Sequence, residues 1–416
     1  MKKRLNILYI SQYFPPEMGA PAARVFELSR EWAQAGLSVT VLTAMPNHPI
    51  GVVPPEYRGK VLVRETTAGI NVTRCWIFPA ANRGFLKRVL NYASFMFSAI
   101  LLGIPNTPEV DVVIGTSPQF LTALAAFVIS RIKRAPFIFE VRDLWPESIV
   151  QLGQIRNPWI IRLLEWLEMF LYRQASHIVV VTDSTATTLQ HRGIPADKIS
   201  VIKNGVDLQL FAPRPKKNQL LSSLKLNNKF IVTYIGTHGL SHALHVVLAA
   251  AKQLQERTEI HFLFIGEGAE KERLQSLARL WQLKNVTFLP QLPKQQLPDY
   301  YALSDVIVVP LRRLPLFTTV IPSKIFEIMA MGKPILLSVE GEARQLVEAA
   351  GAGQFVPPED PNALAQAIVA LQKAPEQLQK MGQAGRQFVA AHFNRRKLAN
   401  QYQQIIEHVI KKHQGV

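Results

Sequence analysis

Short apolar runs alternate with segments of helical periodicity along the first half of the chain. The expected strands are Leu5–Ser11, Val39–Thr43, Val110–Ile114, Phe137–Val141 and Ile178–Val181. The expected helices between them are Ala22–Ala35, Leu121–Ile132 and Trp159–Gln174. Uninterrupted apolar strands separated by helices are typical of a parallel sheet covered on both faces. The first half therefore predicts one α/β domain.

The second half repeats this alternation after a basic, Pro-rich segment, Phe211–Asn218, that predicts a linker. The expected strands are Phe230–Ile235, Ile260–Ile265, Val286–Phe288, Val306–Val309 and Pro334–Ser338. The expected helices are Ala243–Gln255, Glu270–Leu280, Ser323–Met331 and most of the chain after Glu376. We expect two α/β domains facing across a cleft, over residues 1–210 and 218–390. Because open parallel sheets bind ligands at the carboxyl ends of their strands, the pattern predicts two ligands across that cleft.

Composition narrows the class of protein. The chain has 416 residues, 48% of them hydrophobic, which is enough for two or three domains with large cores. Its one cysteine, Cys75, excludes a disulfide scaffold or a multi-cysteine metal site and fits a reducing compartment. The 47 Lys and Arg against 30 Asp and Glu give a net charge of +17. Such a charge attracts nucleic acid, phosphorylated small molecules or an anionic membrane surface.

One apolar stretch, Val89–Pro105, raises the question of a membrane. It is slightly shorter than the roughly 20 residues of a spanning helix. Its polar residues are Asn91, Ser94 and Ser98, and the basic residues before it are Arg83, Lys87 and Arg88. The pattern leaves open a core helix, a helix lying at a membrane surface or a spanning helix, and it favours the first two. The basic start Met1–Arg4 lacks a cleavage site behind it, so we expect a buried first strand and not a signal peptide.

Two glycine-containing loops follow expected strands of the second domain. Gly236-Thr237-His238-Gly239 comes after Phe230–Ile235, where glycine lets backbone N–H groups approach an anion. Gly266-Glu267-Gly268 follows the next strand. Each loop is either a phosphate site or a plain tight turn. The spacing is not G-x-G-x-x-G, which disfavours a nicotinamide cofactor.

Charged residues gather at two further places. Ser323, Lys324 and Glu327 open an expected helix, with Arg312 shortly before it. Lysine there suits phosphate and glutamate suits ribose hydroxyls; the alternative is an exposed ion pair at i,i+3 spacing. Arg142 and Asp143, in the segment Glu140–Ser148, follow a first-domain strand and either line a site or belong to a structural network. We interpret Asn204–Asp207 as support for an interdomain hinge.

Taken together, these motifs resemble family 4 glycosyltransferases, which have two Rossmann-like domains in the architecture called GT-B. The resemblance covers nearly the whole chain and rests on Gly19 in the Pro-rich loop after the first strand, Asn204–Asp207, Phe211, Gly266–Gly268 and above all Pro322–Pro334. Arg142–Ser148 and Gly236–Gly239 are similar to the subgroup that makes bacterial surface polysaccharides, typified by L-fucosamine transferases.

The resemblance implies a retaining, metal-independent transfer from a nucleotide-diphospho-sugar, preferably a UDP-sugar, without a cofactor. The donor would bind mainly to the second domain, and a saccharide or polyprenyl-diphosphate-linked acceptor to the first. Helix 391–416 would cross back to the first domain. The donor-binding residues would be Gly19, Gly236, Thr237, His238, Gly239, Gly266, Glu267, Ser323, Lys324 and Glu327. The catalytic residues would be Arg142, Asp143, Arg312 and Lys324, with the two cations of the second domain balancing charge on the leaving diphosphate.

The chain also departs from the family pattern. Thr319 stands where the family has the first acidic residue of an E-x7-E motif, and Thr237, His238 and His242 stand where many relatives have Arg and Lys. The histidine that the family often has at the position of Arg142 is absent. A nucleotide-sugar epimerase and a non-catalytic relative of the same architecture therefore remain alternatives. A nucleic-acid-binding protein is disfavoured because no helix-turn-helix, zinc or aromatic-basic motif is visible.

The excess positive charge is too widely spread to serve one diphosphate alone. Arg83, Lys87 and Arg88, together with Arg395-Arg396-Lys397, predict a face held against anionic lipid. We therefore expect a cytoplasmic enzyme that is peripheral on the inner face of the cell membrane.

Overall fold

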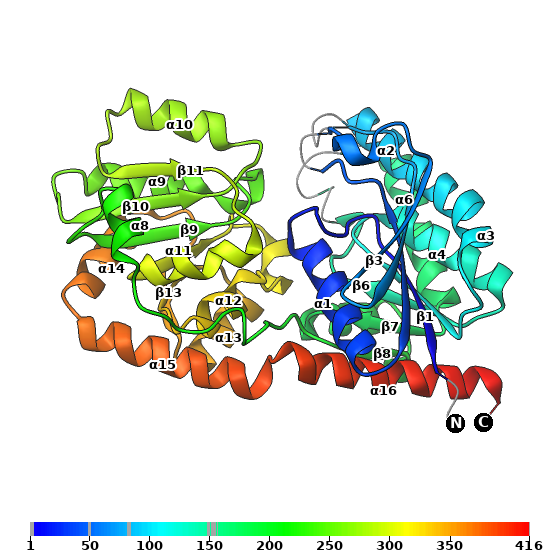
Figure 1. Cartoon of the computed structure of the whole chain (residues 1–416). Coiled ribbons are helices and arrows are strands. Elements are labelled where there is room, and N and C mark those ends of the chain that lie inside the picture. The colour runs from blue at the N-terminus through cyan, green and yellow to red at the C-terminus, as the bar shows by residue number, and fades with distance from the viewer. Residues whose placement is uncertain are drawn as a thin grey trace. The chain divides into compact units, whose positions relative to one another are not determined.

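The chain folds into two compact units, each built around a mainly parallel sheet (Figure 1). The computed structural model describes residues 4–48, 51–80, 85–147, 150, 155 and 157–415. Unit 1 comprises Met1–Lys203 and Arg395–Val416, and unit 2 comprises Asn204–Asn394. Two parallel-sheet α/β domains are the fold class that the sequence predicts, and this prediction is confirmed.

Within the described residues, the sheet of unit 1 has eight strands in the order β3-β4-β2-β1-β5-β6-β7-β8. They are β1 (Asn6–Ile10), β2 (Ser38–Ala44), β3 (Leu62–Thr67), β4 (Ile70–Cys75), β5 (Val112–Thr116), β6 (Phe137–Val141), β7 (His177–Val180) and β8 (Ile199–Val201). All neighbours are parallel except β3 and β4, which form an antiparallel hairpin. The sequence analysis missed this hairpin because β3 is an edge strand with mostly exposed or half-buried residues, so it has no continuous apolar run.

Helices cover both faces of this sheet. On one face α1 (Ala20–Gln34) and α16 (Arg395–Gln414) pack on alternate residues such as Ile7 and Tyr9. The indole N–H of Trp32 donates to the carbonyl of Ala399 at 2.9 Å, which ties α16 to α1. The C-terminal helix therefore belongs to unit 1. On the other face, α2 (Phe85–Ser98), α4 (Phe120–Lys133), α6 (Pro158–Gln174) and α7 (Asp183–His191) pack on the intervening strand residues.

The apolar stretch forms one helical run in which α2 continues through a π-helical segment, η2 (Ala99–Gly103), into α3 (Ile104–Asn106). Its inner face is buried: Phe95 is wholly inaccessible, and a Cβ on Gly103 would lie 2.5 Å from the Leu42 side chain on β2. Among the described residues one helix, Leu86–Asn106, is long and apolar enough to cross a membrane, and 28% of its most apolar window is buried. Because its inner face forms part of the core of unit 1, we interpret the run as a covering helix of the sheet.

The sheet of unit 2 has six parallel strands in the order β11-β10-β9-β12-β13-β14. They are β9 (Phe230–Ile235), β10 (Ile260–Ile265), β11 (Val286–Leu289), β12 (Val306–Pro310), β13 (Ile335–Ser338) and β14 (Gly353–Phe355). The helices are α8 (Asn218–Ser223), α9 (Leu244–Gln253), α10 (Lys271–Leu280), α11 (Leu297–Leu303), α12 (Lys324–Ala330), α13 (Glu342–Ala349), α14 (Pro361–Gln372) and α15 (Pro375–His392). Residues of α9, α10 and α14 form the main apolar core with one face of the sheet.

The boundary between the units lies after Lys203, earlier than the Pro-rich segment that the sequence suggests as a linker. That segment packs on unit 2. Phe211 is wholly buried, Arg214 pairs with Asp299 at 3.2 Å, and Lys216 pairs with Asp305 at 2.6 Å. The basic residues that make the segment look like a linker are thus fixed by carboxylates far away in the sequence.

Candidate active site

The two glycine loops of unit 2 leave the same edge of its sheet. β9 and β10 are neighbours in register, with Ile235 opposite Ile265, so Gly236 and Gly266 follow at equivalent positions. The loops are in direct contact: a Cβ on Gly266 would lie 1.9 Å from the Gly236 carbonyl oxygen. Both glycines also have positive φ, which side chains rarely adopt. Glycine is therefore required here by the close approach of two backbones, and the loops present bare backbone at the carboxyl end of the strands.

Lys324, at the start of α12, points at the first of these loops. Its Nζ lies 4.0 Å from the centroid of the Tyr234 ring, and a Cβ on Gly236 would be 2.5 Å from this Nζ. Burial lowers the pKa of Lys324 to about 7, although Glu327 partly opposes the shift. The ammonium is therefore poorly compensated by the protein, and a bound anion would stabilise its charged form.

Glu327, one turn along α12, has two partners that the sequence analysis missed. Its Oε2 accepts a hydrogen bond from the Tyr301 hydroxyl at 3.0 Å, and its Oε1 lies 3.5 Å from Lys294 Nζ. The ion-pair partner of Glu327 is thus Lys294 and not Lys324, which corrects the alternative of an i,i+3 pair. No local pattern marks Lys294 and Tyr301, because they come from the β11–β12 connection.

Other predicted donor-binding residues have partners inside unit 2. The Arg312 guanidinium, about half exposed, lies 3.6 Å from Glu359, while its backbone N–H donates to the Ser241 carbonyl beside the first glycine loop. Glu267 pairs with Lys271 at 2.5 Å. The backbone of Arg312 is therefore close to the first glycine loop. Its side chain would have to break the ion pair with Glu359 to reach a ligand at this loop.

The side chain of His238 points into the core of unit 2. It is wholly buried, lies edge-on to Phe264 and Phe288, and neither ring nitrogen has a hydrogen-bond partner. Burial lowers its pKa to about 3, so the ring is neutral. The backbone of His238 is also used by the fold, because its N–H donates to the Glu267 carbonyl at 2.8 Å and its carbonyl accepts from the Glu270 N–H at 2.9 Å. Donor binding by His238 therefore stays a prediction. His242 is likewise neutral, because burial, and after it the nearby Lys324, lowers its pKa to about 3.

Thr237, Gly239, Ser323 and Thr319 complete the predicted set in unit 2. The Thr237 carbonyl accepts from the Tyr234 hydroxyl at 2.7 Å, which fixes the loop that ends at Gly239. Ser323 precedes α12 and makes no side-chain capping bond. Thr319, where the resemblance leads us to look for a carboxylate, ends η6 (Pro315–Thr319) and donates to the Leu316 carbonyl at 2.9 Å. The Thr319 hydroxyl therefore forms a hydrogen bond within its own 3-10 turn.

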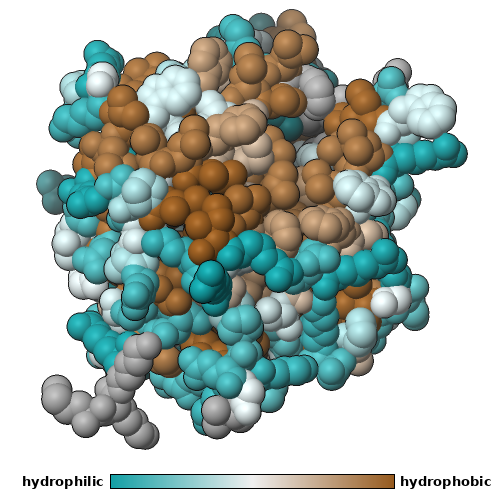
Figure 2. Space-filling view, turned by 90° about the vertical axis from the view of Figure 1, so that its right-hand side faces the viewer, coloured by the Kyte–Doolittle hydropathy of each residue, from teal (hydrophilic) through white to brown (hydrophobic). Residues whose placement is uncertain are grey.

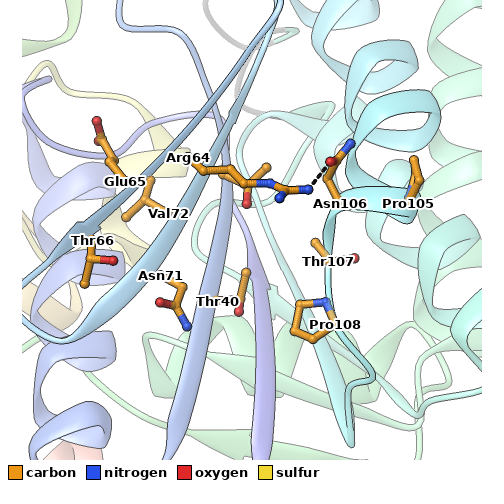
Figure 3. Close-up of a pocket in the computed structure, with 11 residues that line it drawn as sticks. Thr40, Arg64, Glu65, Thr66, Asn71, Val72, Pro105, Asn106, Thr107 and Pro108 are labelled. Atoms are coloured by element: carbon orange, nitrogen blue, oxygen red, sulfur yellow. Dashed lines mark hydrogen bonds between the residues drawn. The ribbon is translucent and has the colours of Figure 1, made fainter.

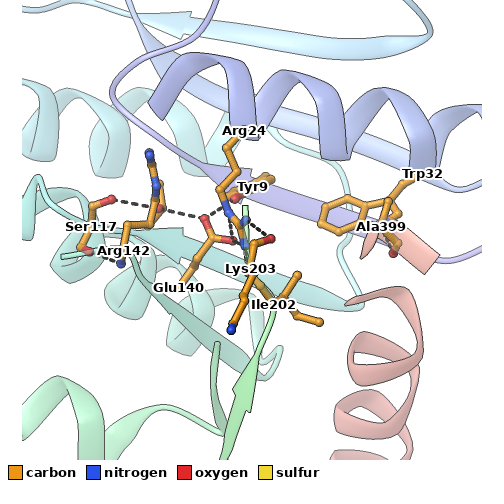
Figure 4. Close-up of polar contacts among 10 residues, drawn as sticks. Tyr9, Arg24, Trp32, Ser117, Glu140, Arg142, Ile202, Lys203 and Ala399 are labelled. Atoms are coloured by element: carbon orange, nitrogen blue, oxygen red, sulfur yellow. Dashed lines mark hydrogen bonds and ion pairs between the residues drawn. The ribbon is translucent and has the colours of Figure 1, made fainter. Parts of the chain in front are cut away.

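In unit 1, the residues at the end of β6 and just after it divide into a buried structural network and two half-buried residues beyond it (Figure 4). Glu140 is wholly buried and accepts from the Tyr9 hydroxyl at 2.6 Å and from Arg24 Nε at 3.0 Å. Glu140, Tyr9 and Arg24 therefore form a structural network, which is one of the two alternatives for this segment. Arg142 and Asp143 follow outside it, and Ser148 lies outside the described residues.

Arg142 carries a guanidinium that the protein does not satisfy. Its backbone N–H donates to Ser117 Oγ at 2.8 Å, but its Nε and Nη1 are buried without a hydrogen-bond partner. Burial lowers the pKa of Arg142 and raises that of its neighbour Asp143. An unpaired buried guanidinium is costly, so this group is placed to bind an anion or a hydroxyl-rich ligand.

Gly19 directly precedes α1 and has a φ of 132°, with no side chain capping the helix. Beside it, Glu17 forms part of a polar cluster that the sequence analysis missed. Glu17 Oε1 accepts from the backbone N–H groups of Asn47 and His48, both at 2.9 Å, while its Oε2 is buried without a partner. Burial raises the pKa of Glu17 to about 7.

The cluster continues to the inner face of α2. The Gln12 side chain donates to Asn91 at 2.7 Å, and Asn91 donates to Asn47 at 3.1 Å. Gln12 Oε1 is a second buried oxygen without a partner. The unpaired oxygens of Gln12 and Glu17, both between β1 and α1, can receive hydrogen bonds from ligand hydroxyls.

A polar pocket of about 470 Å³ lies elsewhere in unit 1, between the β3–β4 hairpin and the end of α3 (Figure 3). Arg64 donates across it to the Asn106 side chain. None of the predicted site residues lines it. Among the described residues, no group of three or more His, Cys, Asp or Glu side chains could hold a metal ion.

Comparison with known proteins shows which family the chain resembles. Residues 19–205 match the glycosyl transferase 4-like domain, and residues 216–388 match the glycosyl transferases group 1 family. A putative colanic acid biosynthesis glycosyl transferase, WcaI of Escherichia coli K12, is 25% identical over 374 residues, covering 88% of this chain and 91% of WcaI. A probable glycosyltransferase, WbjE of Pseudomonas aeruginosa, is 28% identical over 336 residues, covering 77% and 82%.

Solved structures agree on the fold. Sucrose-phosphate synthase from Thermosynechococcus elongatus superposes with a TM-score of 0.76 at 21% identity, covering 98% of this chain and 100% of that one. Anabaena HepE, in complex with UDP and glucose, superposes with a TM-score of 0.73 at 18% identity, covering 97% and 100%. The two domain matches follow one another along the chain, and the protein is a glycosyltransferase with the GT-B fold.

Proposed function

We propose that this enzyme transfers a sugar from a nucleotide-diphospho-sugar, preferably a UDP-sugar, to a saccharide or polyprenyl-diphosphate-linked acceptor during synthesis of a bacterial surface polysaccharide. The names of the relatives support the pathway, because WcaI is named for colanic acid and TuaH of Bacillus subtilis for teichuronic acid. HepE in complex with UDP and glucose supports the donor class. The observation that carries the proposal is Lys324 Nζ packed against Gly236 where two glycine loops meet.

The donor binds unit 2 in this proposal. The Lys324 ammonium binds the diphosphate, because it is positive and poorly compensated. Backbone N–H groups of the glycine loops assist it, other than those of Gly236, His238 and Gly266, which donate to carbonyls of unit 2. Glu327 accepts from ribose hydroxyls, with Tyr301 and Lys294 holding its carboxylate in place. We propose that the transfer retains anomeric configuration and needs neither metal nor cofactor, with Lys324 and Arg312 balancing charge on the leaving diphosphate.

The acceptor binds unit 1 in this proposal. The unsatisfied guanidinium of Arg142 supports this assignment, and so do the unpaired oxygens of Gln12 and Glu17. Asp143, whose pKa is raised by burial, orients an acceptor hydroxyl. A polyprenyl-linked acceptor would place the enzyme on the cytoplasmic face of the cell membrane. The L-fucosamine transferase subgroup remains a prediction.

A donor panel tests the proposal. Purified enzyme is titrated with UDP-, GDP- and dTDP-sugars by calorimetry, and transfer from the tightest binder to membrane extract is then followed with radiolabelled sugar. We expect a UDP-sugar to bind and Lys324→Ala to lose most of the transfer activity. Lys284→Ala is the matched control, because Lys284 is exposed on the same unit and its replacement removes the same charge.

Two results would contradict the proposal. Transfer by Lys324→Ala within a few-fold of wild type would remove Lys324 from the site. A new isomer of the sugar formed from donor alone would identify an epimerase, the alternative that Thr319 keeps open.

A further inference from the structure

Helix α6 carries an apolar stripe on its outer surface. Trp159, Leu163 and Trp166 stand at i, i+4 and i+7, so they share one face of the helix. They are 75%, 60% and 63% exposed. Single exposed apolar side chains are common on protein surfaces. A periodic outward stripe with two tryptophans instead indicates a surface that binds a protein or a membrane.

Helix α2 and its continuation carry a second outward stripe on the same side of the sheet. Leu86, Leu90, Phe97 and Leu101 are 73%, 50%, 58% and 71% exposed. The opposite face of the same helix supplies Asn91 and Phe95 to the interior of unit 1. This helical run is therefore amphipathic in an unusual sense: its inner face is packed and partly polar, and its outer face is apolar.

α4 lies between these helices and packs against both, so the two stripes belong to one surface. We call Leu86, Leu90, Phe97, Leu101, Trp159, Leu163 and Trp166 the apolar platform. Figure 2 looks onto this side of the molecule and shows a broad apolar area bordered below by hydrophilic side chains. The platform lies on the opposite face of the sheet from α1 and α16.

The charges around the platform are mostly positive. α2, α4 and α6 carry six basic residues, Lys87, Arg88, Arg131, Lys133, Arg162 and Arg173, against two acidic residues, Glu165 and Glu168. Arg88 is half-buried, with its Nε inside unit 1, so it contributes little to the surface. Glu168 is buried, with partners in Tyr172 and Arg192, so it contributes little to the surface. Basic residues bordering an apolar surface are the composition that binds an anionic bilayer in the interfacial plane.

The basic segment Arg395–Lys397 does not belong to this surface, which corrects the expectation from the sequence. α16 packs on the other face of the sheet, and Arg395 is buried in an ion pair with Glu27 at 2.7 Å. Arg83, also expected there, lies outside the described residues.

We propose that the apolar platform is the membrane-docking surface of this enzyme, and that α6 inserts Trp159, Leu163 and Trp166 into the headgroup boundary of an anionic bilayer beside the stripe of α2. A second copy of the chain is a poorer occupant, because symmetric pairing of the platform would bring two sets of basic residues together. The inference rests on the proposed function only in that a polyprenyl-linked acceptor would lie in the same bilayer.

Vesicle co-sedimentation tests this surface without donor or acceptor. The full chain is spun with vesicles of phosphatidylcholine containing phosphatidylglycerol, and with pure phosphatidylcholine. We expect binding to the anionic vesicles and weaker binding to the neutral ones. The triple variant Trp159→Ser, Leu163→Ser, Trp166→Ser should lose at least about tenfold in vesicle affinity, because three apolar side chains no longer partition. Phe97→Ser with Leu101→Ser should weaken binding separately.

The control is Leu280→Ser on α10 of unit 2, where the leucine is 74% exposed but stands outside the platform. It should bind vesicles like wild type. The proposal is overturned if the α6 variant binds anionic vesicles as tightly as wild type, or if wild type does not bind them. It is also overturned if wild type without vesicles is a dimer and the α6 variant is a monomer. UDP-sugar binding, measured on the same proteins, should be unchanged; its absence in wild type would refute the donor assignment and leave the docking surface standing.

Discussion

The Lys324 ammonium sits 4.0 Å above the Tyr234 ring and against the backbone of Gly236, so one residue joins α12 to the loop after β9. The ring is held in turn, because the Tyr234 hydroxyl donates to the Thr237 carbonyl inside that loop. The cation is therefore placed by packing on both sides and does not depend on an ion pair with Glu327. This arrangement prepares a positive site in the absence of ligand, which reduces the cost of ordering it when an anion binds.

The depressed pKa of Lys324 predicts a pH-dependent donor affinity. Only the ammonium form attracts diphosphate, and burial lowers its pKa to about 7. Affinity for UDP-glucose, measured by calorimetry, should therefore fall as the pH rises from about 6 to about 8. Lys324→Met should bind weakly throughout and show no such slope. An unchanged slope in that variant would assign the titration to another group.

The lowered pKa of Lys324 also predicts how the free energy of unfolding changes with pH. Between about 7 and the ordinary lysine pKa of 10.5, the unfolded chain holds a proton on Lys324 that the folded chain has lost. The free energy of unfolding of wild type should therefore rise with pH in this window relative to Lys324→Met. Urea denaturation of both proteins at several pH values measures the difference, and a difference that falls with pH would refute the shift.

Gly236→Ala should abolish donor binding while leaving the protein folded. The new Cβ would lie 2.5 Å from Lys324 Nζ and would meet a φ of 140°, so the lysine must move out of the site. Gly193→Ala is the matched control, because Gly193 has a φ of 84° but open space around its Cα. It should also carry the strain of a positive φ, but it should bind UDP-glucose normally. Equal binding by both variants would show that the glycine loop is only a turn.

Arg142→Met should stabilise unit 1 and eliminate transfer. Two buried nitrogens of the Arg142 guanidinium have no partner, so an apolar side chain of similar length removes a desolvation penalty. We expect a gain of about 1 kcal/mol in the free energy of unfolding. Denaturant unfolding and the transfer assay on one preparation measure both effects. A loss of stability would mean that the guanidinium supports the fold.

Arg24→Met should have the opposite effect on stability, although it is the same substitution at another buried arginine. Arg24 Nε lies 3.0 Å from Glu140, and its Nη2 donates to the Ile202 carbonyl at 3.0 Å. Removing it leaves Glu140 buried without its cation, at a cost of about 3–5 kcal/mol. Combining it with Glu140→Gln should recover part of this loss in a double-mutant cycle. Strictly additive losses would contradict the coupling.

Local patterns predicted the parallel strands and the residues that follow them. β9 and β10 begin and end where the apolar runs predict, and Gly36 and Gly332, which follow α1 and α12, have positive φ. These features depend on neighbours in the sequence: a continuous apolar run must be buried on both faces, and a chain that leaves a helix in the left-handed region favours glycine. The β3–β4 hairpin has neither signal and was missed.

The partners of the site residues come from distant parts of the chain. Glu327 is held by Lys294 and Tyr301, and the Pro-rich segment joins unit 2 through Asp299 and Asp305. No spacing rule relates residues that are brought together only when the sheet forms. The same holds for His238, whose ring could have faced a ligand but packs between Phe264 and Phe288.

The sequence by itself determined that Trp159, Leu163 and Trp166 share one face of a helix, because helical periodicity fixes that relation. It did not determine whether that face meets the sheet or the solvent, since α6 is apolar on both sides. The tertiary structure decided it: α6 buries Leu171 and Tyr172 against the sheet, which leaves the tryptophans outside. Which face is buried depends on the elements that cover it, and these are assembled from the whole unit.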